Sequence, residues 1–101
     1  MEITTRANGT SVDINVFGTI KTISDGQNIK DAVRRAFEQD SGRAINVYVK
    51  DSFIITSSVI GFLIKSIKID KMALVVYVGS PELYTMLDDM NLIDSMNVRK
   101  A

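Results

Sequence analysis

Three consecutive hydroxyl side chains, Thr56, Ser57 and Ser58, are the residues of this chain best suited to carry chemistry. They follow the apolar residues 53–55 and precede an apolar run with helical spacing, where a hydroxyl is a typical N-cap. We expect Ser57 to cap this helix, beside free backbone N–H groups and the positive end of the helix dipole. A phosphate on Ser57 would be stabilised there, because helix N-termini bind anions. The pattern predicts a simple cap or, alternatively, a phosphorylation site.

The chain lacks most of the residue types that enzymes and metal sites usually use. The 101 residues contain no cysteine and no histidine, which excludes disulfides, thiolate zinc sites, cysteine nucleophiles and histidine bases. Asp88 and Asp89 are adjacent, so their carboxylates would diverge around a helix and make a poor catalytic pair. No glycine-rich phosphate loop is present. We therefore expect a protein that is not an enzyme and that uses no cofactor and no metal ion.

The charge and hydropathy patterns indicate which kinds of partner and which cellular location to expect. Lys+Arg and Asp+Glu number 12 each, so the formal net charge is zero and gives no overall attraction to nucleic acid or anionic membranes. Residues 1–6 lack the basic-then-apolar pattern of a secretory signal. The longest apolar runs are far shorter than the roughly 20 residues that span a bilayer. We expect a cytoplasmic protein that binds neither nucleic acid nor membrane.

Periodicity along the chain predicts alternating strands and helices. Strands are expected over residues 12–16, 45–49 and 72–78, with a shorter one over 2–6 before an Asn8-Gly9 turn. Amphipathic helices are expected over 28–39, over 58–67 and from Ser80 onward. In the first of these helices, Lys30 and Arg34 take the polar face. The order is that of an α/β fold, a sheet covered by amphipathic helices, in a single domain over 1–101.

The order and separation of these motifs resemble the STAS domain of the anti-sigma-factor-antagonist family. Members of that family carry a strand, then Asp-Ser-Ser-Gly-hydrophobic-Gly, a helix, an apolar strand, Ser-Pro and a final helix that ends near Gly-Leu. Here residues 51–55 lead into Thr56-Ser57-Ser58, Gly61 follows, and Ser80-Pro81 opens the last helix. The likeness covers most of the chain and includes Gly18, and it implies a STAS-like mixed sheet.

The resemblance assigns roles to the hydroxyl run. Ser57 falls on the phosphoacceptor serine of the family, Ser58 on the serine after it, and Gly61 on the second glycine. Thr56 and Ser58 are the alternative acceptors. Thr56 stands where the family usually has aspartate, and Asn91 stands where it usually has glycine before Leu92.

The same likeness predicts a partner-binding surface. Lys21 lies near a position that is often acidic in the family, and Val59 replaces the first glycine of the motif. Val59 and Phe62 are expected to form an apolar docking patch beside the hydroxyl run. The predicted partner-binding residues are Lys21, Thr56, Ser58, Val59 and Phe62.

The expected function is that of a protein-interaction module switched by phosphorylation at Ser57. In the family, the unmodified form binds an anti-sigma-type serine kinase or a related regulatory protein, and a phosphatase removes the phosphate. The alternative is a STAS scaffold or assembly module in a signalling complex that is never phosphorylated. A homodimer is left open.

Overall fold

A five-stranded mixed sheet and three helices make up the structure, a computed structural model that describes all 101 residues. The elements are β1 (Glu2–Asn8), β2 (Ser11–Phe17), α1 (Ile23–Gln39), β3 (Ala44–Val49), α2 (Ser57–Lys68), β4 (Leu74–Val78), α3 (Pro81–Asp89) and β5 (Val98–Lys100). The strand order follows the chain order, with β1 antiparallel to β2 and all other neighbours parallel. The predicted α/β class is confirmed. None of the helices has both the length and the apolar character needed to cross a bilayer.

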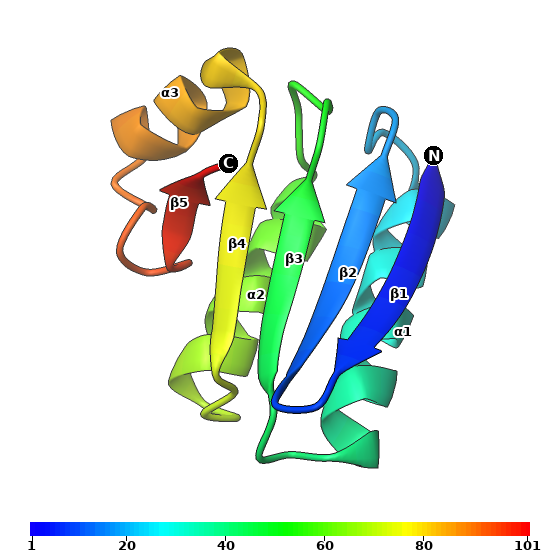
Figure 1. The fold of residues 1–101 in the computed structure, drawn as a ribbon. Helices are drawn as coiled ribbons and strands as arrows, with labels where there is room; N and C mark the ends of the chain where they lie inside the picture. Colours follow the sequence, from blue (N-terminus) through cyan, green and yellow to red (C-terminus); the bar gives the residue numbers. More distant parts are fainter.

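The consecutive strand order explains why α1 and α2 lie side by side on one face of the sheet (Figure 1). Crossovers between neighbouring parallel strands are almost always right-handed, so successive crossover helices fall on the same side. Val12, Ile14 and Val16 of β2 point to this side and are buried. The opposite face carries half-exposed residues such as Tyr48 and Tyr77, whose rings stack with centroids 4.6 Å apart. Helices therefore cover one face of the sheet and leave the other open.

Helix α1 begins five residues earlier than the sequence predicts. The pair Asp25-Gly26 is typical of a turn and predicts a break between elements. Instead, Thr22 and Asp25 form a capping box that starts the helix at Ile23. Gly26 is buried because α2 passes close to it. A Cβ atom at Gly26 would lie 3.1 Å from a methyl group of Val59, so glycine here permits the close approach of the two helices.

A residue with left-handed backbone angles ends α3. Asn91 has φ 58°, a conformation that asparagine tolerates better than most residues. The backbone N–H of Leu92 donates to the carbonyl of Leu87 (2.9 Å), and that of Asn91 donates to the carbonyl of Asp88 (2.9 Å). These two bonds form a Schellman motif, which turns the chain toward β5. The sequence patterns did not predict β5, which has three residues.

Two polar residues fix the loop between β3 and α2. The Oδ1 atom of Asp51 accepts a hydrogen bond from the backbone N–H of Gly18 (2.7 Å). The hydroxyl of Ser52, which is fully buried, accepts from the N–H of Ile20 (3.0 Å) and donates to the carbonyl of Ile54 (2.7 Å). This loop is therefore tied to the loop after β2, and both loops lead into the start of a helix at the same end of the sheet.

Candidate functional site at the start of α2

The cap of α2 is Thr56, and the prediction that Ser57 is the cap is wrong. The Oγ1 atom of Thr56 accepts a hydrogen bond from the N–H of Val59 (3.3 Å), and its carbonyl accepts the first helical bond, from Ile60 (3.0 Å). Thr56 has extended backbone angles, whereas Ser57 is the first residue with helical geometry. Threonine and serine both serve as caps, so the sequence of three hydroxyl groups did not show which one takes the position.

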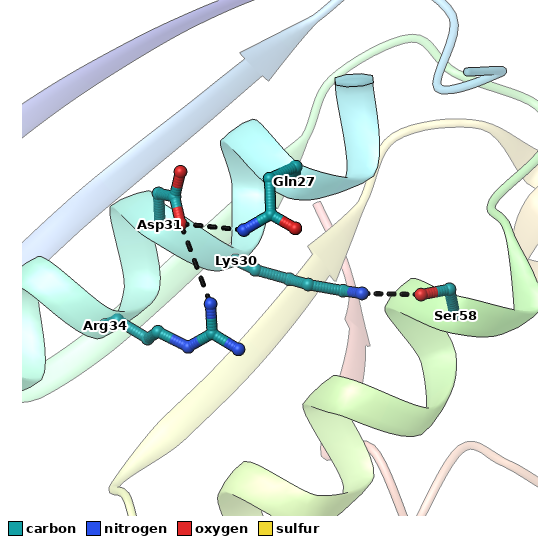
Figure 2. A network of polar contacts seen from close by, with 5 residues as sticks. All are labelled: Gln27, Lys30, Asp31, Arg34 and Ser58. Atoms are coloured by element: carbon teal, nitrogen blue, oxygen red, sulfur yellow. Dashed lines mark hydrogen bonds and ion pairs between the residues drawn. The ribbon is translucent and has the colours of Figure 1, made fainter. Parts of the chain in front are cut away.

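The three hydroxyl groups of the run have different surroundings. Thr56 is committed to the cap, and the Oγ of Ser58 accepts a hydrogen bond from the Nζ of Lys30 on α1 (2.5 Å) (Figure 2). Ser57 is exposed, and its hydroxyl forms no hydrogen bond. Of the three groups, only that of Ser57 is both accessible and unengaged.

Lys30 lies on α1 among other polar side chains, and its ammonium group points toward Ser58 at the start of α2 (Figure 2). The Nε2 of Gln27 donates to Asp31 Oδ1 (2.9 Å), and Arg34 forms an ion pair with the same oxygen (3.6 Å). Helical spacing predicts that Lys30 and Arg34 lie on the polar face of α1, but it does not predict their contact with α2. The signal that could have connected them is the strand order, because neighbouring parallel crossovers place α1 beside α2.

A small recess between the starts of α1 and α2 brings together three of the predicted partner-binding residues. Lys21, Thr56 and Ser58 all line it, together with Lys30 and Gly26. Lys21 is exposed. The first turn of α2 contains no acidic residue. The recess therefore combines two ammonium groups with the positive end of a helix dipole.

The predicted docking patch of Val59 and Phe62 is wrong for Val59. Val59 is 0% exposed, because it points at Gly26 of the neighbouring helix. When two helices pack side by side on a sheet, each buries two faces. One face contacts the strands, and the other contacts the neighbouring helix. Phe62 is half-buried against the core, and the guanidinium of Arg34 lies 5.1 Å from its ring centroid. Only part of the Phe62 ring is available to a partner.

Helix α1 shows what a negative group does at a helix start in this protein. The carboxylate of Asp25 accepts hydrogen bonds from the backbone N–H groups of Lys21 and Thr22, both at 3.1 Å. These bonds hold the pKa of Asp25 below its ordinary value, and the bond from Lys21 contributes most. Helix α2 has no such carboxylate, and the backbone N–H groups of Ser57 and Ser58 have no acceptor within the protein. A phosphate at this helix start would find unsatisfied donors.

In comparisons with known proteins, no family model and no curated protein matches this sequence. No group of three or more carboxylates lies close enough together to hold a metal ion. The start of α2 offers unpaired backbone N–H groups and the positive end of a helix dipole to a negatively charged group.

Proposed function

We propose that this protein is a protein-interaction module whose binding surface surrounds the start of α2 and is switched by phosphorylation at Ser57. The observation that carries the proposal is the contrast within the hydroxyl run. The hydroxyl of Ser57 is exposed and forms no hydrogen bond, whereas Thr56 caps the helix and Ser58 is bound by Lys30. The resemblance of the motif order to anti-sigma-factor antagonists supports the same residue.

The surroundings of Ser57 allow the modification without unfolding. A phosphate adds a charge of about −1.5 to −2 and three acceptor oxygens. The unpaired N–H groups of the first turn of α2 lie next to it, and the ammonium of Lys30 binds the following residue, Ser58. Since this charge would be compensated locally, the effect of phosphorylation falls on the partner rather than on the fold. A partner that contacts the exposed start of α2 would face a new, partly desolvated double charge.

The partners implied by this proposal are a serine kinase of the anti-sigma type, or a related regulatory protein, and a phosphatase, all acting in the cytoplasm. Lys21 and Thr56 lie in the same recess and carry no negative charge, although the related family tends to be acidic at these positions. The facing surface of the partner should therefore be less basic than that of a typical anti-sigma kinase. The combined variant Thr56→Asp and Lys21→Glu should not bind the native partner more tightly, and a marked gain in affinity would argue against a divergent partner.

The proposal is tested by phosphate incorporation followed by intact-mass measurement. Wild type, Ser57→Ala and Ser58→Ala are incubated with ATP and a cytoplasmic extract of the source organism. We expect one added phosphate in wild type and in Ser58→Ala, and none in Ser57→Ala. The Ser58 variant is the matched control, because it removes a neighbouring hydroxyl on the same helical turn. Modification that persists in Ser57→Ala would show that the acceptor is a different residue.

A scaffold that is never phosphorylated is the second candidate. The burial of Val59 favours it, because the position of a glycine in the related family is used here for helix packing. An unmodified wild type after incubation, together with a Ser57→Asp variant that binds its partner as tightly as wild type, would establish this alternative. Under the switch, Ser57→Asp keeps its circular dichroism spectrum and loses partner binding in part or completely.

A further inference from the structure

We infer that strand β1 is a self-association surface, through which a second copy of this chain extends the sheet across a two-fold axis. The two edges of the sheet differ in length (Figure 1). Strand β5 has three residues, whereas β1 has seven consecutive residues paired on one side only. It contains no proline and pairs with β2 without a bulge. Proteins usually protect long regular edges, because unpaired strand edges bind other strands.

The backbone of β1 has free groups at alternate residues. The N–H of Lys50 donates to the carbonyl of Val16 (3.0 Å), so the even-numbered residues of β2 direct their backbone groups toward β3. The odd-numbered residues of β2 therefore face β1, and the register pairs them with the even-numbered residues of β1. It follows that Ile3, Thr5 and Ala7 direct their N–H and C=O groups at the open edge.

The side chains of β1 select one register for an antiparallel copy. Glu2 and Arg6 lie on the same face of the strand, four residues or about 13 Å apart, which is too far for an ion pair within the chain. Neither side chain forms a hydrogen bond or an ion pair, and Asp13, opposite Arg6, accepts instead from Asn8 and Asn46. A two-fold axis at Thr4 places Glu2 of each copy opposite Arg6 of the other.

This register also satisfies the free backbone groups. With the axis at Thr4, Ile3 of one copy lies opposite Thr5 of the other, and both residues direct their backbone groups at the open edge. Arg6 then lies between the Asp13 carboxylate of its own chain and the Glu2 carboxylate of the second copy. The same two-fold arrangement therefore pairs the opposite charges and brings the free backbone N–H and C=O groups of the two strands together. The contact area of one strand pair is small, so we expect a dissociation constant of about 10–100 µM.

The test is sedimentation velocity at low salt over roughly 5 to 500 µM protein. Wild type should pass from monomer to dimer. Glu2→Arg and Arg6→Glu should each weaken the dimer about tenfold or more, because each replaces two attractive contacts by two repulsive ones. An equal mixture of these two variants should form a heterodimer, because every Arg then faces a Glu. Monomeric wild type throughout this range, or single variants that dimerise as well as wild type, would overturn the inference.

A backbone variant provides an independent measurement. Thr5→Pro removes an N–H that points at the open edge, and edge strands tolerate proline at such positions. It should stay monomeric with an unchanged circular dichroism spectrum, whereas Thr5→Ala should dimerise. In wild type, amide hydrogen exchange at Ile3, Thr5 and Ala7 should slow with rising protein concentration, while exchange at Thr4 and Arg6 should not. Slowing at all five amides alike, or at none, would contradict pairing through this edge.

Discussion

The Nζ atom of Lys30 on α1 lies 2.5 Å from the Oγ atom of Ser58, the second residue of α2. This contact connects the polar face of one helix to the N-terminus of the next. It leaves the neighbouring Ser57 as the exposed and unengaged hydroxyl of the run. It also holds an ammonium group within one residue of the proposed phosphorylation site.

The capping role of Thr56 predicts different stabilities for two adjacent alanine variants. Thr56→Ala removes the acceptor for the N–H of Val59 and should lower the free energy of unfolding by about 1 kcal/mol. Ser57→Ala removes an exposed hydroxyl without a partner and should change it by less than about 0.5 kcal/mol. Urea denaturation at neutral pH measures both values. A similar loss in the two variants would show that Ser57 contributes to the cap.

The sign of a charge placed at Ser57 should decide its effect on stability. Ser57→Asp puts a carboxylate at the positive end of the α2 dipole, near Lys30, and should raise the free energy of unfolding by about 0.3–1 kcal/mol at low salt. Ser57→Lys should lower it by a similar amount. Thermal unfolding followed by circular dichroism measures both, and added salt should reduce the difference. Identical melting of the two variants would rule out an electrostatic role for this helix start.

Two glycines, Gly79 after β4 and Gly61 within α2, should respond in opposite ways to alanine. A Cβ atom at Gly79 would lie 2.1 Å from the backbone oxygen of Lys50, so the ends of β3 and β4 must separate. We expect Gly79→Ala to cost about 1–3 kcal/mol. Gly61 is exposed within α2 and has open space around it, so Gly61→Ala should stabilise the protein by up to about 1 kcal/mol. Chemical denaturation of both variants checks the pair, and a destabilised Gly61→Ala would mean that this position is packed.

Asp25 makes stability depend on pH in the acidic range. Its pKa in the folded state is lower than the unfolded value of 3.8, so the folded state binds this proton less readily than the unfolded state. The stabilisation is therefore present above pH 3.8 and is lost as the pH falls through the lower, folded pKa. Asp25→Asn should be less stable than wild type at pH 7, and the difference should shrink toward pH 2. Urea denaturation across this range measures it, and a constant difference would refute the assignment.

Much of the fold was readable from periodicity. Alternation at Val12, Ile14 and Val16 predicted β2, and residues 45–49 predicted β3, because strand side chains point alternately to the two faces of a sheet. Predictions from short sequence motifs were wrong where a residue serves a cap or a tertiary contact instead. Asp25-Gly26 resembled a turn, but Asp25 closes a capping box and Gly26 is needed for helix contact. The three-residue strand β5 is too short to show a period.

The hydroxyl run at 56–58 and the helix after it were determined by the sequence alone, because capping chemistry and helical spacing are local properties. Tertiary structure decided what each residue of that segment does. The side-by-side packing of α1 and α2 buries Val59, engages Ser58 through Lys30 and leaves Ser57 exposed. The same holds for β1, whose residues predict a strand but not that one of its edges stays unpaired. Burial, hydrogen bonding and an unpaired strand edge all depend on which elements lie next to each other. Contacts between residues far apart in the chain decide which elements those are.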